Sequence, residues 1–156
     1  MNARRDETEL ERWDRNFTEL LQELRVAQTG VQILFAFLLT LPFSVRFDRV
    51  SSLDKVVYVA TLLAAATSTA LLIAPVSYHR QVFRQGRKPQ LVRTASALAK
   101  AGLAALLLAI VGAVFVVLDV VAGLGWAAGL VAAVAALYVT LWYLLPMLTR
   151  RAGRFP

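Results

Sequence analysis

Three long stretches of this sequence contain no charged residue, and they constrain the fold more than any other feature. They run from Val56 to Val76, from Ala101 to Leu118 and from Val120 to Thr149. A helix needs roughly 18 to 20 consecutive apolar residues to cross the roughly 30 Å hydrocarbon core of a bilayer. Each of the three stretches therefore predicts a membrane-spanning helix.

A fourth uncharged stretch, residues 26–45, is less apolar because Gln28, Thr29, Gln32 and Thr40 interrupt it. We still predict a span here, since a helix satisfies its own backbone hydrogen bonds and tolerates some polarity at one end. The fold class is therefore expected to be all-α: a polytopic membrane helical bundle of four transmembrane helices with a long amphipathic N-terminal helix. The predicted spans cover residues 26–45, 55–77, 97–118 and 124–148.

The predicted organisation has three parts. Residues 1–25 form a cytoplasmic amphipathic helix that continues into the first span, residues 26–149 form the transmembrane domain, and residues 150–156 form a basic cytoplasmic tail. No cysteine and one histidine are present, so we expect no disulfide, no metal site and no cofactor. No nucleophile–base pair, phosphate-binding loop or dinucleotide fingerprint occurs, so we expect no catalytic residues and no enzymatic activity.

Lysine and arginine are divided unequally between the two sides of the predicted membrane. Fourteen of the 17 fall before the first span, between the second and third spans, or after the fourth, and three fall on the other side. The positive-inside rule places the fourteen, together with both termini, in the cytoplasm. A nucleic-acid-binding protein would instead gather basic residues on one folded face with stacking aromatic rings. We therefore expect the lipid bilayer, and no nucleic acid, as a partner.

Apolar residues at alternating spacings of three and four predict one continuous helix, or two helices joined by a soft bend, from about Thr8 to Leu41. The spacing is typical of a coiled-coil seam, and Thr8 and Glu11 form a capping box at its start. At 1.5 Å per residue this helix is about 50 Å long, so its first half lies outside the hydrocarbon. We expect no other segment of the chain to cover that half, so residues 8–24 are predicted to meet a second copy, a protein partner or the membrane surface. The seam comprises Leu10, Trp13, Phe17, Leu20, Leu24, Ala27, Val31, Leu34, Leu38 and Leu41.

Small residues four apart predict where helices approach closely, because they let two backbones come together. Pro75 is expected to bend or end the second span, and Asp119 and Gly123 to make the turn between the third and fourth. The small-residue stripes are Ala60, Ala64 and Ser68 in the second span, Ala101, Ala105, Ala109 and Ala113 in the third, and Gly125 and Gly129 in the fourth.

The inner half of the first span carries the strongest candidate site. Unpaired amides are costly in hydrocarbon, so a polar face here should meet protein or water. It can line a path for transported ions, or it can hold helices together by hydrogen bonds. Its members are Glu19, Glu23, Arg25, Gln28, Thr29 and Gln32, of which the last four share one face.

Two further candidates lie at the predicted membrane boundaries. Tyr78, His79 and Arg80 follow Pro75 at the cytoplasmic end of the second span. A histidine there can titrate near neutral pH and act as a gate or sensor, while the alternative is an interfacial cluster at headgroup level. Asp119 can mark an outer mouth that attracts cations or protons, while the alternative is a carboxylate that caps a turn.

A run of residues in the first span resembles a bacterial family of small four-helix membrane proteins classed as a domain of unknown function. Some members of that family carry an automatic sodium:proton antiporter label, whereas such chemistry needs an acid or histidine deep in the membrane, and no span here has one. The resemblance implies the topology and a bacterial cytoplasmic membrane, and it implies no established activity. It rests on Glu19-Leu20-Leu21-Gln22-Glu23-Leu24-Arg25-Val26, then Gln28, Gly30, Gln32 and Phe35, with Pro75, Tyr78-His79-Arg80 and Phe83.

Four slender, alanine-rich spans leave little room for a path through one subunit. We therefore expect a homo-oligomer that conducts or transports a small ion along a path lined by the first span. The alternative is a non-transporting accessory or scaffold membrane protein whose cytoplasmic N-terminal helix binds a partner.

Overall fold

The computed structural model describes residues 9–45, 47, 50–82 and 88–152. Within these ranges every regular element is helical, and four helices are long and apolar enough to cross a membrane. The predicted all-α fold with four spans is thus confirmed. The elements are α1 (Glu9–Thr40), a 3-10 turn (Leu41–Phe43), α2 (Ser52–Val82), α3 (Lys88–Ala122), α4 (Leu124–Val139), a π-helical segment (Thr140–Leu144) and α5 (Leu145–Ala152).

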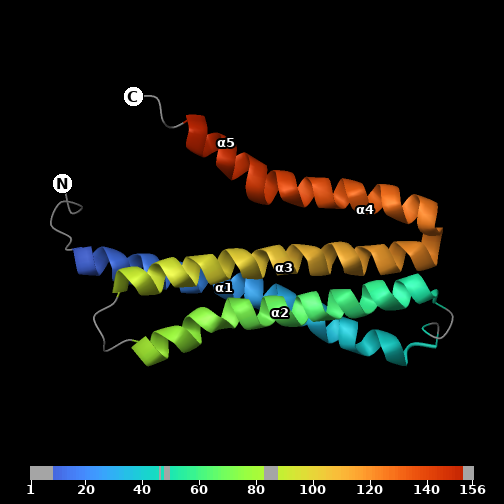
Figure 1. The fold of residues 1–156 in the computed structure, drawn as a ribbon, viewed down its shortest axis with the longest axis horizontal. Helices are drawn as coiled ribbons and strands as arrows, with labels where there is room; N and C mark the ends of the chain where they lie inside the picture. Colours follow the sequence, from blue (N-terminus) through green and yellow to red (C-terminus); the bar gives the residue numbers. More distant parts are fainter. Residues whose placement is uncertain (1–8, 46, 48–49, 83–87, 153–156) are drawn as a thin grey trace.

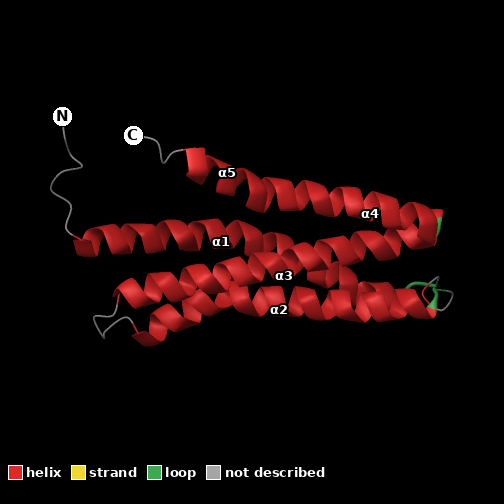
Figure 2. Ribbon diagram, turned by 45° about the horizontal axis from the view of Figure 1, so that its top comes forward, coloured by secondary structure: helices red, strands yellow, loops and turns green. Residues whose placement is uncertain are grey.

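Helices α1, α2 and α3 run side by side as a three-helix bundle, and α4 and α5 form an arm beside it (Figures 1 and 2). Among the described residues, α4 contacts α3 but neither α1 nor α2. We call the end where α1 begins and α5 ends the terminal end (Figure 1). The opposite end, the hairpin end, holds the α1–α2 connection and the α3–α4 turn. At that turn Gly123 adopts a φ of 82°, and its N–H donates to the carbonyl of Asp119 at 2.9 Å.

The bundle core follows the spacing of a coiled coil on all three helices. On α1 the predicted seam is confirmed, because its buried residues recur every seven positions. On α2 the buried positions alternate between steps of four and three, and on α3 they do so as far as Ala109, after which Val116 follows seven residues later. They are Phe17, Leu24, Val31 and Leu38 on α1; Asp54, Tyr58, Thr61, Ala65, Ser68, Leu72 and Pro75 on α2; and Ala95, Ala99, Gly102, Leu106, Ala109 and Val116 on α3.

The predicted small-residue stripes are only partly correct. Ser68 and Ala109 are buried as expected, whereas Ala60 and Ala101 are exposed. A four-residue step turns about 40° beyond one helical turn, so a stripe of fours drifts off a contact that has a 3.5-residue period. At Gly125 and Gly129 no atom lies within 4 Å of where a Cβ would stand, so their predicted helix contact is not formed within the described chain.

Helix α3 begins at Lys88, nine residues before the predicted third span, and the contacts of this first part overturn one prediction. Its first turns reach back along α1, where Phe17 packs with Ala95 and Val92. Seven residues further along α1, Leu24 packs in the same apolar cluster as Leu72 of α2 and Ala99 of α3. The expectation that no other segment of the chain covers the first half of α1 was therefore wrong for Phe17 to Leu24. The basic residues at the start of α3 do not end the helix, because lysine and arginine are good helix formers. The side chains of Leu10 and Trp13 lie outside the described residues.

Two prolines act differently from a simple helix stop. Pro75 does not end α2, which continues to Val82, and its ring is fully buried in the seam. The fourth predicted span is not a uniform helix, because a π-helical segment separates α4 from α5 just before Pro146. Proline has no N–H to donate to the carbonyl four residues earlier, so the ladder is disturbed at this point.

Candidate functional site

The structure divides the predicted polar cluster of the first span, and Gln28 is its inward-facing member. The Gln28 side-chain amide donates to the carbonyl of Leu72 on α2 at 2.7 Å. Pro75 interrupts the hydrogen-bond ladder of α2 close to this point, where carbonyls tilt out of the helix. Gln28 therefore joins α1 to α2, which is the helix-contact role that the sequence left open.

The other polar residues of this part of α1 are exposed on the surface of the bundle. We define the α1 stripe as Gln22, Arg25, Thr29 and Gln32, which recur at steps of three and four and are all exposed. The Thr29 hydroxyl donates to the carbonyl of Arg25 at 3.0 Å, so it is satisfied within its own helix. Gln32 lies about 16 Å along the helix from Phe43, where the span ends, and so is near the middle of a 30 Å core.

The two glutamates of the cluster lie nearer the terminal end. Glu19 and Glu23 are both exposed, and Glu19 pairs with Arg15 at 3.7 Å between Oε1 and Nε. Both partners are more than half exposed, and an exposed pair of this kind contributes little to stability. The structure does not bring the two glutamates together with Gln28. The predicted polar cluster is therefore divided into three parts: inward-facing Gln28, the exposed α1 stripe, and the two glutamates nearer the terminal end.

Tyr78, His79 and Arg80 lie in the last turns of α2, because the helix passes Pro75 and continues to Val82. Their side chains lie outside the described residues. The backbone places all three at the terminal end of the bundle, near the connection from α2 to α3. Their role as a gate or sensor stays a prediction.

Asp119 meets a second carboxyl that the sequence reasoning missed. Its side chain lies beside that of Asp54, across the interface of α2 and α3, close enough for the two carboxyl groups to interact. Asp54 is buried at 3% exposure and closes a capping box with Ser51. Its Oδ2 accepts from the Ser51 N–H at 3.3 Å and from the Ser51 hydroxyl at 2.8 Å, while the Asp54 N–H donates to that hydroxyl at 3.1 Å. The Ser51-x-x-Asp54 spacing was the available signal.

The paired carboxyls leave one acceptor of Asp54 without a protein donor. Oδ1 is buried and has no hydrogen-bond partner among the described residues. The pair belongs to α2 and α3 at the hairpin end, so Asp119 does not lie on the α1 stripe.

The described residues contain no group of three or more histidine, aspartate or glutamate side chains that could hold a metal ion. No curated protein and no solved structure matches the chain. A family model described as a family of unknown function (DUF6328) matches residues 6–146. The match includes all four helices that can cross a membrane and nearly the whole chain. The chain therefore belongs to this family of unknown function, DUF6328.

Proposed function

We propose that the chain is one subunit of a homo-oligomeric membrane protein that conducts or transports a small ion along a path lined by the α1 stripe. One observation carries the proposal: Thr29 and Gln32 are exposed on the bundle surface near the middle of the span. A polar side chain at this depth is costly against lipid, so it favours contact with water or protein. A second copy of α1 around a shared axis supplies both.

The packing of the single subunit supports a path between subunits. Its interior is filled mainly by the apolar and small residues of the heptad seams, and several of its buried polar groups are hydrogen-bonded within the bundle. The Ser68 hydroxyl, for example, donates to the carbonyl of Gly102 at 2.8 Å. The proposed path therefore lies outside the three-helix bundle, along the stripe from Gln22 to Gln32. It requires no catalytic step.

We place the terminal end in the cytoplasm and the protein in the bacterial cytoplasmic membrane. Fourteen of the 17 lysines and arginines precede the first span, lie between the second and third spans or follow the fourth in the sequence. The described ends of the helices next to these segments lie at the terminal end (Figure 1). The basic segments next to spans are retained on the cytoplasmic side during insertion. In this orientation the path runs from Arg25, near the cytoplasmic boundary, to Gln32 in the middle of the bilayer.

The absence of cysteine from the sequence allows a direct test. Gln32→Cys is reconstituted in liposomes and treated with a charged, membrane-impermeant thiol reagent, while cation flux and disulfide cross-linking are measured. Ile33→Cys is the matched control, because Ile33 is 68% exposed on the neighbouring apolar face of the same helix. We expect Gln32→Cys to react, to cross-link to a second copy, and to lose flux on modification, while Ile33→Cys does none of these. Equal reaction at both positions, or no reaction at Gln32→Cys, refutes the proposed path.

The alternative is a non-transporting scaffold, and one observation favours it. Gln28 shows that part of the polar cluster holds helices together rather than lining a path. A partner protein could use the remaining stripe in the same way. In that case the purified protein gives no ion flux above empty liposomes, and Gln32→Cys cross-links to a different protein in membranes from the native host.

A further inference from the structure

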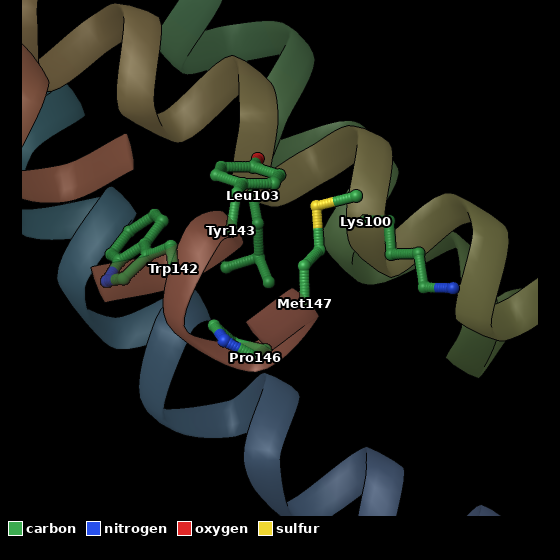
Figure 3. Close-up of a pocket in the computed structure, with 6 residues that line it drawn as sticks. All are labelled: Lys100, Leu103, Trp142, Tyr143, Pro146 and Met147. Carbon is green, nitrogen blue, oxygen red and sulfur yellow. The ribbon is translucent and has the colours of Figure 1, made fainter. Parts of the chain in front are cut away.

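A groove opens between α3 and the arm at the terminal end of the molecule (Figure 3). The π-helical segment and Pro146 redirect the chain, and among the described residues no Cα atom of α5 lies within 8 Å of a Cα atom of α3. The space left between them has a volume of about 440 Å³, which is the size of a small-molecule pocket. Its lining residues are Lys100 and Leu103 of α3, Trp142 and Tyr143 of the π-helical segment, and Pro146 and Met147 of α5.

The chemistry of the lining changes from apolar to charged at one edge. Leucine, methionine, proline and aromatic rings form the walls, and Lys100 is the charged residue that lines the groove. Its ammonium group is directed away from the other lining residues (Figure 3). The side chain is exposed, and Arg93, seven residues earlier, is exposed on the same face of α3.

The groove lies at the edge of the hydrocarbon. Lys100 is about 33 Å along α3 from Ala122, where the span ends at the hairpin end. This distance equals the thickness of a bilayer core, so the ammonium reaches the headgroup region of the leaflet at the terminal end. Tryptophan and tyrosine prefer this depth, because one edge of each ring is apolar and the other is polar.

We propose that this groove binds one anionic phospholipid of the leaflet at the terminal end, with an acyl chain against the apolar walls and the phosphate beside Lys100. Water is a poor occupant, because the walls offer few hydrogen-bonding groups. A second copy of this chain would have to bring an apolar helix past the positive charges of Lys100 and Arg93. An anionic lipid supplies the apolar chain and the opposite charge together.

Tryptophan fluorescence tests the proposal, because bromine on an acyl chain quenches a tryptophan that it touches. A variant with Trp142 as its single tryptophan is made by Trp13→Phe and Trp126→Phe. It is reconstituted with brominated phosphatidylglycerol or brominated phosphatidylcholine in an unlabelled background. The matched control keeps Trp126 alone, which is 73% exposed at the hairpin end and reports ordinary lipid contact. We expect about a fivefold preference for phosphatidylglycerol at Trp142, corresponding to one lysine–headgroup interaction, and none at Trp126.

Lysine variants identify the source of the preference. Lys100→Gln should abolish it, whereas Lys55→Gln should leave it unchanged, since Lys55 is exposed at the other end of the molecule. Equal quenching by the two lipids at Trp142 overturns the proposal, as does an equal loss from Lys55→Gln. A Trp142 that neither brominated lipid quenches also overturns it, because the groove then holds protein. Lys100 is exposed, so Lys100→Gln should retain the helical circular dichroism of the parent.

Discussion

Helices α2 and α3 approach closely where Gly112 faces Thr61, and adding one methyl group there should separate them. A Cβ at residue 112 would overlap the Thr61 hydroxyl oxygen. It would also lie 3.1 Å from the Thr61 Cβ and 3.3 Å from its Cγ2. Rotation of the threonine does not relieve the overlap, because all of its side-chain atoms are close and the residue is buried at 3% exposure.

Two opposing effects set the magnitude for Gly112→Ala. Alanine is favoured over glycine inside a helix by about 1 kcal/mol. Forcing an extra carbon into a packed contact costs about 1–3 kcal/mol. The net result is a loss of up to about 2 kcal/mol in the free energy of unfolding. Gly129→Ala is the matched control, because no atom lies within 4 Å of its added Cβ, and it should gain up to about 1 kcal/mol.

The measurement is unfolding by sodium dodecyl sulfate in mixed micelles, followed by far-ultraviolet circular dichroism. Thr61→Ala removes the hydroxyl and the γ-methyl group, so the double variant Thr61→Ala, Gly112→Ala should recover most of the loss through a coupling between the two sites. If Gly112→Ala unfolds at the same detergent fraction as Gly129→Ala, the close approach of α2 and α3 is refuted. Additive effects in the double variant would equally show that the two residues are not in contact.

Three smaller changes can be measured by the same titration. Gln28→Leu should lower the free energy of unfolding by about 0.5–1 kcal/mol, because the hydrogen bond to the Leu72 carbonyl is lost. Gln32→Leu is the control and should leave the free energy of unfolding unchanged. Equal effects of the two variants would mean that Gln28 does not join α1 to α2. Ser51→Ala should lower the free energy of unfolding by about 1 kcal/mol, since both hydrogen bonds of the Ser51 hydroxyl with Asp54 are lost. An unchanged midpoint would show that this hydroxyl does not stabilise the start of α2. Gly123→Ala should cost about 1–2 kcal/mol, because an L-residue is strained at a positive φ, and a neutral result would contradict the turn.

The seam of α1 could be predicted from the sequence, whereas those of α2 and α3 could not. On α1, large apolar residues such as Phe17 and Leu24 stand out against polar neighbours, so the 3.5-residue period is visible. Helices α2 and α3 are apolar nearly all round, so periodicity carries little contrast. Several of their buried positions are small or polar, among them Thr61 and Ser68. The four-residue spacing of small residues therefore did not predict correctly which positions of α2 and α3 are buried.

The polar residues of α1 can be identified from the sequence, whereas their arrangement cannot. Gln28 and Gln32 are the same residue type, one turn apart, and nothing in the sequence shows that only Gln28 meets α2. That difference depends on where the carbonyls before Pro75 come to lie. The contact of Asp54 with Asp119 depends on the register of two helices whose partners are 65 residues apart in the sequence. The capping box of Ser51 and Asp54, which the sequence analysis missed, is by contrast a pattern that sequence can show, because its geometry is local.

The fourth helix shows why exposed apolar residues and exposed polar residues lead to different conclusions in this protein. Helix α4 has a single buried residue, Ala127, and the rest of it is apolar and largely exposed. In a bilayer this needs no partner, because the helix satisfies its own backbone and lipid is as apolar as leucine. A polar side chain at the same depth differs, since lipid offers it no hydrogen bond. The exposed groups that need a binding partner are therefore the polar ones, Gln32 in the α1 stripe and Lys100 at the groove. Both proposals depend on these two residues rather than on the larger apolar face of α4.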